Sequence, residues 1–539
     1  MIKSKINIKS LTYTTLLSAY FAYILNIKFW TFLWTGSEIN GIFDVAALVG
    51  FLIVFFSIYF CFFSLIAVPY IGKIIIAVLL ICSAAADYSS QNLGIVINPD
   101  MIRNFAETTA REASDFFTLP FVCYVMLLGV LPAICLFWIK VEYSPLKKEI
   151  RNRLLSCGMV LALSALILPI FYKSYISFGR NNYQIRYYIN TFNYISAVVR
   201  YHKKNANKNR SFVILDNNPY VLSRTSGQPR VLVLIVGETA RANNFSLYGY
   251  SKKTNPLLEK QDIIAFQKTI SCGTSTAVSL PCMFSVTGKR KFDITDAKYT
   301  QNVLDIVQAA GDRVIWKDND DGCKNVCVRA EYINAQAENK QPYCFNDYCH
   351  DDILLDNLEV TLDEIKKDTL IVLHMMGSHG PAYYKRYPET MNVFGPACNT
   401  EDLQDCSQEE IVNAYDNTIL YTDYIISSVI DLLKTKNNLQ SSMLYVSDHG
   451  ESLGEHNIYL HGLPDKIAPK EQKEVPMILW LSDNVKNNMN IDISCLRHNA
   501  EKNSFSHDNY AHTILGLLEV QTKTYQKNLD ILNTCIKTE

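Results

Sequence analysis

Long apolar stretches in the first third of the chain constrain its fold more than any other feature. Five of them are long enough to cross about 30 Å of hydrocarbon. The first has no compact apolar core followed by a small-residue cleavage site, so we expect it to be retained and not removed as a signal peptide. The sequence therefore predicts a membrane domain of five helices over residues 1–173. The predicted spans are Leu11–Trp30, Val45–Ala67, Ile71–Tyr88, Phe117–Ile139 and Leu154–Tyr172.

Basic residues predict the orientation of these spans. With five spans, three groups of Lys and Arg fall on the same side. That side is expected to be the cytoplasm, because basic loops tend to stay there. An odd number of spans then places everything after Tyr172 outside the cytoplasm. The three groups are Lys3, Lys5 and Lys9; Lys73; and Lys140, Lys147, Lys148, Arg151 and Arg153.

The cysteines of the polar part indicate the same compartment. Eight of the 15 cysteines form four couples that are close in sequence, a pattern typical of disulfides in an oxidising compartment. None of the couples has the C-x2-C spacing of a zinc ribbon, which is the competing interpretation. The predicted bridges are Cys272–Cys282, Cys323–Cys327, Cys344–Cys349 and Cys398–Cys406, with Cys495 and Cys535 as candidates for a fifth.

The polar part is predicted to begin with a connector and to continue as an α/β domain. Residues 174–228 are rich in Tyr, Phe, Asn and basic side chains, which suits interfacial helices and a polar linker. Residues 229–539 alternate short apolar runs with helical stretches, a pattern typical of a central, mostly parallel sheet with helices on both faces. The balance of 51 basic and 52 acidic residues gives no reason to expect nucleic-acid binding. The expected strands are Val231–Val236, Arg313–Trp316, Thr369–Leu373, Met443–Val446 and Pro476–Leu481.

Carboxylate and imidazole side chains follow several of these strands. Ligands bind outside the carboxyl ends of the strands in such sheets, so the residues just after each strand are expected to gather in one place. A single buried His or Asp is usually a satisfied core residue, whereas the whole set predicts a site. The set comprises Glu238; Asp318, Asn319 and Asp320; His374 and His379; and Asp448, His449 and His461.

Part of this set is suited to hold a metal ion. Glu238, Asp448 and His449 would make a four-ligand site together with one hydroxyl. Carboxylates and imidazoles are suitable ligands for zinc, whereas manganese would prefer more oxygen. His379 and His461 remain to hold an anionic substrate group or a second metal.

The hydroxyl is expected to come from the small-residue loop Ser271–Cys282, which reads SCGTSTAVSLPC. A threonine hydroxyl is a poor nucleophile at neutral pH, but a divalent metal bound to its oxygen favours the alkoxide. The loop offers two such hydroxyls, Thr274 and Thr276, and residue chemistry alone does not choose between them.

Six motifs distinguish the polar domain: VGETAR (Val236–Arg241), SCGTSTAVSLPC, GSHGP (Gly377–Pro381), SDHGESLGE (Ser447–Glu455), YLHG and PKEQ…VPM (Pro469–Met477). Together they resemble the phosphoethanolamine transferases. These are inner-membrane enzymes of Gram-negative bacteria, of the kind that modify lipid A and confer polymyxin resistance. Their catalytic domain belongs to the alkaline phosphatase/sulfatase superfamily. The resemblance runs over nearly the whole chain, and the combined motifs are highly specific, although SDHG alone marks only the superfamily.

The resemblance implies roles for individual residues. The catalytic zinc would be bound by Glu238, Thr276, Asp448 and His449, with Thr276 as the nucleophile. The phosphate and headgroup site would be lined by His379, His461 and Lys324. The donor lipid would be held with the help of Asn104, Thr108 and Glu112, which share one helix face through their four-residue spacing. The chain departs from the family at Asp320, where relatives often have Asn, and at His456, an additional candidate ligand or a surface side chain.

The implied reaction is a two-step transfer by a monomer in the bacterial inner membrane, with its catalytic domain in the periplasm. Thr276 attacks the phosphorus of phosphatidylethanolamine and diacylglycerol leaves. An acceptor oxygen of lipopolysaccharide, expected to be a lipid A phosphate, then takes the phosphoethanolamine from the threonine.

Three alternatives compete with this interpretation. A phosphoglycerol transferase of the lipoteichoic-acid-synthase type also has five spans and a threonine nucleophile, but the cysteine couples and the SCGTSTAVSLPC loop favour the first interpretation. A sulfatase needs C-x-P/A-x-R, which neither Cys272 nor Cys282 begins. A non-catalytic membrane sensor with a decayed enzyme domain would usually have lost metal ligands, and none of the expected ones is missing.

Overall fold

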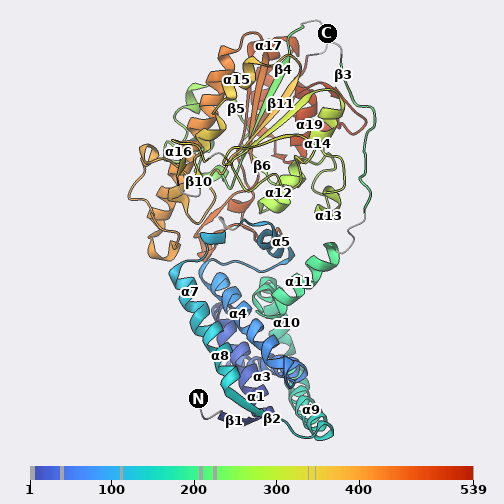
Figure 1. The fold of residues 1–539 in the computed structure, drawn as a ribbon, viewed down its shortest axis with the longest axis vertical. Coiled ribbons are helices and arrows are strands. Elements are labelled where there is room, and N and C mark those ends of the chain that lie inside the picture. Colours follow the sequence, from blue (N-terminus) through green and yellow to red (C-terminus); the bar gives the residue numbers. More distant parts are fainter. Residues whose placement is uncertain are drawn as a thin grey trace. The chain divides into compact units, whose positions relative to one another are not determined.

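The computed structural model describes residues 6–36, 42–109, 113–205, 210–222, 227–337, 339–345 and 348–537. The chain divides into two compact units, which are described separately (Figure 1). The first comprises Met1–Ile102 and Phe117–Tyr201, and the second comprises Arg103–Phe116 and His202–Glu539. A short segment between two predicted spans therefore belongs to the second unit.

The first unit is a helical bundle. Its described residues include five helical stretches that are long and apolar enough to cross a membrane, as the sequence predicts. The third and fifth are the continuous helices α4 (Ile71–Asn92) and α9 (Leu146–Ile170), and α3 (Ile42–Ile66) contains the second. The first combines α1 (Ser10–Tyr23), η1 (Ile24–Asn26) and α2 (Ile27–Gly36). The fourth combines α7 (Leu119–Val125), the π-helical turn η2 (Met126–Val130) and α8 (Leu131–Trp138).

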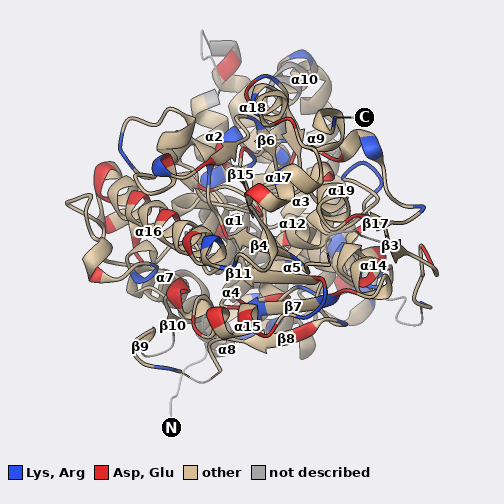
Figure 2. Cartoon of the chain, turned by 90° about the horizontal axis from the view of Figure 1, so that it is seen from above, with Lys and Arg blue, Asp and Glu red and all other residues tan. Residues whose placement is uncertain are grey.

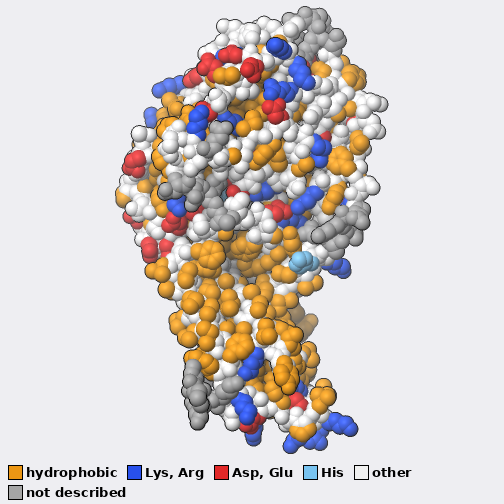
Figure 3. All heavy atoms as spheres, viewed as in Figure 1, with side chains coloured by type: hydrophobic (Ala, Val, Ile, Leu, Met, Phe, Trp, Pro, Cys, Tyr) orange, Lys and Arg blue, Asp and Glu red, His pale blue; other side chains and the backbone are white. Residues whose placement is uncertain are grey.

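The outer surface of these helices is strongly apolar (Figure 3). Leu65, Leu154 and Leu166 are among its exposed side chains. Exposed apolar surface of this extent is typical of contact with lipid and not with water.

One end of the first unit carries a short parallel pairing of β1 (Ile6–Lys9) with β2 (Ile139–Glu142). The pairing puts the residues before the first span beside those after the fourth, so both lie on one side of the bundle. This is the arrangement that the distribution of basic residues predicts. Glu149 strengthens the same end, because it accepts hydrogen bonds from Ser10 at 2.6 Å and from Arg153 at 2.9 Å.

The predicted connector divides between the two units, and its part up to Tyr201 belongs to this bundle. It forms α10 (Tyr172–Asn181), η3 (Tyr183–Tyr188) and α11 (Phe192–Asn205). The side chain of Asn190 donates to the carbonyls of Leu25 and Ser83 at 2.7 and 2.8 Å. The domain boundaries at 173 and 228 remain a prediction.

The second unit is built on a sheet that has seven strands in the described part of the chain. The strand order is β5-β15-β12-β4-β11-β7-β8, and the five strands from β12 to β8 run parallel. The strand β15 runs antiparallel to both of its neighbours. The mostly parallel α/β class is therefore confirmed. The bounds are β4 Arg230–Gly237, β5 Ile263–Ala265, β7 Arg313–Asp318, β8 Glu331–Asn334, β11 Thr369–His374, β12 Gln440–Ser447 and β15 Met477–Leu481.

Helices cover both faces of this sheet. Figures 1 and 2 show α16 (Gln408–Thr435) on one side of the strands and α14 (Val303–Ala309) with α19 (Asp508–Leu517) on the other. The face toward α14 and α19 carries alternate residues of β4, namely Leu232, Leu234 and Val236, in one buried apolar cluster. The two faces alternate along β4 because successive side chains of a strand point to opposite sides.

The expectation of disulfides is confirmed in the second unit. The structure contains the bridges Cys272–Cys282, Cys323–Cys327, Cys344–Cys349 and Cys398–Cys406, and also Cys495–Cys535. The cysteines of the first unit, among them Cys61 and Cys157, are free thiols.

Candidate active site

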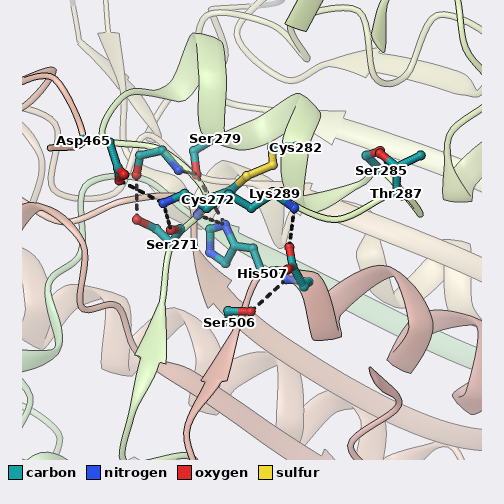
Figure 4. Close-up of a disulfide and its surroundings, with 12 residues drawn as sticks. Ser271, Cys272, Ser279, Cys282, Ser285, Thr287, Lys289, Asp465, Ser506 and His507 are labelled. Atoms are coloured by element: carbon teal, nitrogen blue, oxygen red, sulfur yellow. Dashed lines mark hydrogen bonds and ion pairs between the residues drawn. A yellow bond between two sulfur atoms is a disulfide. The ribbon is translucent and has the colours of Figure 1, made fainter. Parts of the chain in front are cut away.

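The loop Ser271–Ser275 leads into α12 (Thr276–Met283), so Thr276 is the first residue of a helix. The Cys272–Cys282 bridge joins the start of the loop to the last turn of that helix (Figure 4). The amide of Cys272 also donates a hydrogen bond to Nδ1 of His507 at 3.1 Å. Two contacts at Cys272 thus hold the start of the loop, and its other end continues directly into α12, where Thr276 is the first residue.

The structure distinguishes the two threonines that residue chemistry left open. The hydroxyl of Thr274 is buried and donates to the carbonyl of Leu463 at 2.6 Å. The hydroxyl of Thr276 lies 3.0 and 3.1 Å from the two carboxylate oxygens of Glu238 and 3.3 Å from Nε2 of His449. Only Thr276 therefore has its oxygen among the expected metal ligands.

Glu238, Asp448 and His449 converge because the strands before them are neighbours. The strands β4 and β12 run parallel with Gly237 opposite Ser447, so the residues that follow them meet at one edge of the sheet. One donor atom from each of the three side chains lies within 4.8 Å of the others, and all three are buried. This is the compact mixed set of oxygen and nitrogen donors that a divalent metal requires.

Hydrogen bonds orient these donors toward a common point. Nδ1 of His449 lies 2.9 Å from the carbonyl of Gly450, so it carries the proton and Nε2 keeps its lone pair. Burial lowers the pKa of His449 to about 4, which keeps the imidazole neutral. Oδ1 of Asp448 accepts the amide of His449 at 2.7 Å, whereas its buried Oδ2 has no hydrogen-bond partner.

These residues fit a bound cation. A buried carboxylate oxygen without a partner is costly unless a positive charge faces it. Burial, with the carboxylates of Asp448 and Asp320 nearby, also raises the pKa of Glu238 well above its usual range. A divalent cation at this point would satisfy Oδ2 of Asp448, Nε2 of His449 and the Glu238 carboxylate together. It would also polarise the Thr276 hydroxyl.

A cleft lies beside Thr276, and all of its walls come from the second unit. Its polar lining includes a cation, two imidazoles and two carboxylates from strand-end loops, which suits an anionic group with a cationic substituent. The lining residues are Asn104, Glu107, Thr108, Thr276, Ala277, Asp320, Asp321, Lys324, His379 and His461.

The two histidines of the cleft are close to the candidate metal ligands. The ring of His461 lies 4.4 Å from that of His449 and 5.5 Å from that of His379, centre to centre. Nδ1 of His461 lies 2.8 Å from a carboxylate oxygen of Glu451, whose other oxygen accepts the hydroxyl of Tyr383 at 2.7 Å. Glu451 therefore fixes the orientation of His461.

The segment Arg103–Phe116 contributes one wall of the cleft. The helix α5 (Pro99–Glu107) ends one residue before Thr108, although the Thr108 amide still bonds to the Asn104 carbonyl at 2.7 Å. Ion pairs anchor the segment, from Lys298 to Glu107 at 2.9 Å and from Arg386 to Asp115 at 2.9 Å. The predicted third residue of this face, Glu112, lies outside the described residues.

Sequence reasoning assigned no role to Glu451 or Gly377, which the fold brings to the site. Glu451 lies inside the SDHGESLGE motif, so its position next to the metal ligands was a usable signal. Gly377 has a φ of +53°, and a Cβ there would lie 2.6 Å from the Glu238 carbonyl, so the GSHGP loop can approach Glu238 only with glycine.

Asp320 and His374 form a second group of donors with Glu238. His456 is exposed and belongs to neither group of candidate ligands in the described residues.

Comparisons with known proteins agree with this architecture. Residues 55–206 match the family model described as phosphoethanolamine transferase EptA/EptB, and residues 230–520 match the sulfatase model. The chain is 40% identical to phosphoethanolamine transferase EptA of Salmonella typhimurium over 96% of both chains. The chain belongs to the phosphoethanolamine transferase family.

Further relatives cover the chain to different extents. Phosphatidylethanolamine transferase Mcr-1 of Escherichia coli is 39% identical over 76% of this chain and 78% of its own. The solved structure of the integral membrane protein lipooligosaccharide phosphoethanolamine transferase A from Neisseria meningitidis is 38% identical. It covers 99% of this chain and 100% of its own, with a TM-score of 0.96. The family that the motifs predicted is thus confirmed, with its combination of a helical membrane unit and a sulfatase-like α/β unit.

Proposed function

We propose that this chain transfers phosphoethanolamine from phosphatidylethanolamine to an outer-membrane lipopolysaccharide acceptor, a lipid A phosphate, through Thr276. The observation that carries the proposal is the Thr276 hydroxyl. It lies within 3.3 Å of the buried Glu238 and His449, at the edge of a polar cleft. The printed names of relatives support the donor and the acceptor, since one is a phosphatidylethanolamine transferase and another a lipooligosaccharide phosphoethanolamine transferase.

In the first step, Oγ1 of Thr276 attacks the phosphorus of the donor, and the bond from phosphorus to the diacylglycerol oxygen breaks. A zinc ion held by Glu238, Asp448, His449 and the threonine oxygen would lower the pKa of that hydroxyl and stabilise charge on the phosphoryl oxygens. The departing oxygen needs a proton. His461 can accept at Nε2 the proton that Thr276 releases and pass it to the departing oxygen, because Glu451 holds Nδ1–H at 2.8 Å.

In the second step, an oxygen of the acceptor phosphate attacks the phosphorus, and the bond to Oγ1 of Thr276 breaks. The Thr276 oxygen regains its place beside Glu238. Lys324 and His379 line the cleft and would hold the phosphate oxygens, and His379 and His461 together are the alternative site for a second metal. Asn104 and Thr108, with Glu112, would hold the donor lipid.

We further propose that the chain is a monomer of the bacterial inner membrane with its second unit in the periplasm. Basic residues before the first span and after the fourth support this orientation. The disulfides of the second unit support an oxidising compartment.

The test is mass spectrometry of lipid A from cells that express Thr276→Ala in place of the wild type. We expect addition of phosphoethanolamine to fall at least about 1,000-fold, because removal of a nucleophile leaves only binding and electrostatic effects. The matched control is Thr274→Ala, which should retain activity, since the Thr274 hydroxyl bonds to Leu463 and not to the donor set. If Thr276→Ala still adds phosphoethanolamine at the wild-type level, Thr276 is not the nucleophile.

A second measurement separates the donor lipids. The second step is stalled by withholding the acceptor, and phosphatidylethanolamine or phosphatidylglycerol is supplied with a label in its headgroup. Label from phosphatidylethanolamine on the peptide containing Thr276 supports the proposal. Label from phosphatidylglycerol would instead indicate a phosphoglycerol transferase.

A further inference from the structure

Next to the candidate zinc ligands lies a second group of buried donors, formed by Glu238, Asp320 and His374. One ligand atom from each lies within 4.8 Å of the others. Glu238 and His374 are fully buried, and the side chain of Asp320 is 6% exposed. The group shares Glu238 with the first group but otherwise draws on different strands, β7 and β11.

The sheet builds this second group in the same way as the first. In register, His374 is opposite Asp318 on β7 and Val236 on β4. Asp320 follows Asp318 by two residues, and Glu238 follows Val236 by two residues. Three adjacent parallel strands therefore deliver one donor each to the same point at their carboxyl ends.

The orientation of His374 indicates what the group binds. Its Nδ1 lies 3.1 Å from Oδ2 of Asp318. Asp318 is itself fixed, because it accepts the indole N–H of Trp316 at 2.7 Å and the amides of Asp320 and Gly322 at 3.0 and 3.2 Å. A carboxylate that holds Nδ1–H of a histidine directs the Nε2 lone pair outward, as in carboxylate–histidine–metal arrangements.

That lone pair has no hydrogen-bond partner. Nε2 of His374 is buried without one, and the oxygen of Asp320 that faces it is 3.6 Å away, beyond hydrogen-bond distance. A lone pair facing a carboxylate in a buried site is repulsive unless a positive charge lies between them. That charge is either a cation or a proton on Nε2.

The local charge favours the cation. Glu238, Asp448 and Asp320 are three carboxylates around a site from which water is largely excluded, and the substrate adds a phosphodiester. One divalent cation on the Asp448 side leaves these three carboxylates with one negative charge, and Lys324 of the same cleft offsets only the charge of the phosphodiester, so the cluster would still repel the substrate. A second divalent cation on the Asp320 side removes that repulsion.

We propose that Glu238, Asp320 and His374 bind a second divalent cation, with the Glu238 carboxylate shared between it and the zinc held by Asp448 and His449. One imidazole and two carboxylates suit Zn²⁺ or Mn²⁺, whereas Ca²⁺ and Mg²⁺ prefer oxygen donors throughout. Asp320 also lines the cleft beside Thr276. The cation would therefore lie where it can hold a phosphoryl oxygen of the substrate.

The experiment measures metal stoichiometry, not transfer, so it stands or falls separately from the proposed reaction. Full-length protein in detergent is stripped of metal and titrated with ZnCl2, and the tightly bound zinc is counted by elemental analysis after desalting. The wild type should retain two equivalents. Asp320→Asn and Asp448→Asn should each retain one, and Glu238→Gln should lose both.

The matched control is Asp321→Asn, which changes the neighbouring acid, whose carboxylate accepts a hydrogen bond from Thr109. It should retain both equivalents. Asp318→Asn supplies a second route if Asp320→Asn is too unstable to purify. It replaces the carboxylate that faces Nδ1–H with a neutral amide and should weaken one equivalent by about 10–100-fold while leaving the other unchanged.

Two results would overturn the inference. One equivalent of zinc in both the wild type and Asp320→Asn would mean that a proton on Nε2 of His374, and not a cation, lies between the imidazole and the Asp320 carboxylate. Two equivalents in both would place the second metal at other donors, such as His379 and His461.

Discussion

At the scale of single residues, the site depends on histidines that have one ring nitrogen already bonded. In each case the bonded nitrogen is Nδ1, so that Nε2 is directed toward the reacting region or the metal donors. A hydrogen bond therefore selects the tautomer that an isolated imidazole would leave open. The pairs are His449 with Gly450, His461 with Glu451, and His374 with Asp318.

His507 is another buried histidine, but both of its ring nitrogens form hydrogen bonds within the fold. Nδ1 accepts the Cys272 amide at 3.1 Å, and Nε2 donates to the Ser447 carbonyl at 3.0 Å. A proton on Nδ1 would break the first of these bonds. Burial accordingly lowers the pKa of His507 to about 4.

This pKa predicts an acid-sensitive contribution to stability. Between pH 6.5 and about 4 the unfolded chain binds a proton at His507 and the folded chain does not, so stability falls as the pH is lowered through this range. The contribution amounts to up to about 3 kcal/mol. Thermal unfolding at pH 7 and pH 5 should therefore show a smaller acid loss for His507→Gln than for the wild type. His498→Gln, which changes an exposed histidine, should behave like the wild type. Equal acid losses in all three proteins would refute the prediction.

At the scale of elements, the sheet shows which strands can be predicted from sequence patterns and which cannot. The five predicted strands are all present, because buried strands read as continuous apolar runs. β8 (EYIN) was not predicted, because it lies at the edge of the sheet and all of its residues are exposed. β5 has three residues, too few for a pattern. The antiparallel direction of β15 was not predicted either. The apolar run Met477–Leu481 shows that a strand is present, but it does not show in which direction the chain enters the sheet.

The same limit applies to the site. Glu238, Asp448 and His449 could be grouped from sequence because each directly follows a strand. The choice of Thr276 over Thr274 could not be made from residue chemistry, since it depends on which hydroxyl the loop buries against Leu463. The pairing of Asp320 with His374 also needed the register between β7 and β11.

The loop and α12 give a prediction about their bridge. Cys272→Ala combined with Cys282→Ala should lower stability by about 3 kcal/mol, and the remote pair Cys495→Ala with Cys535→Ala by about 4 kcal/mol, because the closed loops span 10 and 40 residues. We expect the first double variant alone to lose transfer activity at temperatures where both are folded, since only that bridge holds Thr276. Chemical denaturation and lipid A mass spectrometry measure the two effects. Full activity of the Cys272/Cys282 variant would show that the loop keeps its shape without the bridge.

At the scale of the whole molecule, the chain passes from the first unit to the second and back. It leaves at Ile102 and returns at Phe117 before entering the second unit again at His202. The cleft is therefore not made by the C-terminal α/β fold alone. Asn104, Glu107 and Thr108, which lie between two spans, complete its wall.

The proposed orientation can be tested with fusions to a secreted phosphatase that is active only after its disulfides form. A fusion after Asp216 should be active, and a fusion after Lys148 inactive, because an odd number of spans separates the N-terminus from the second unit. A fusion after Lys73 tests the other basic turn and should also be inactive. If the fusion after Lys148 were active and the fusion after Asp216 inactive, the orientation in the membrane would be the opposite of the one proposed.

The order of the bridges has a consequence for how the protein is made. Each of the five joins two cysteines that are consecutive in the second unit, and no bridge spans more than 40 residues. By contrast, the neighbouring strands β4 and β12 pair residues such as Arg230 and Gln440, which are far apart in sequence. A chain that emerges from the membrane N-terminus first can therefore close each bridge as its second cysteine appears, before the sheet assembles. Oxidation in order of emergence already gives the native pairing, so biogenesis should require an oxidant but little isomerase.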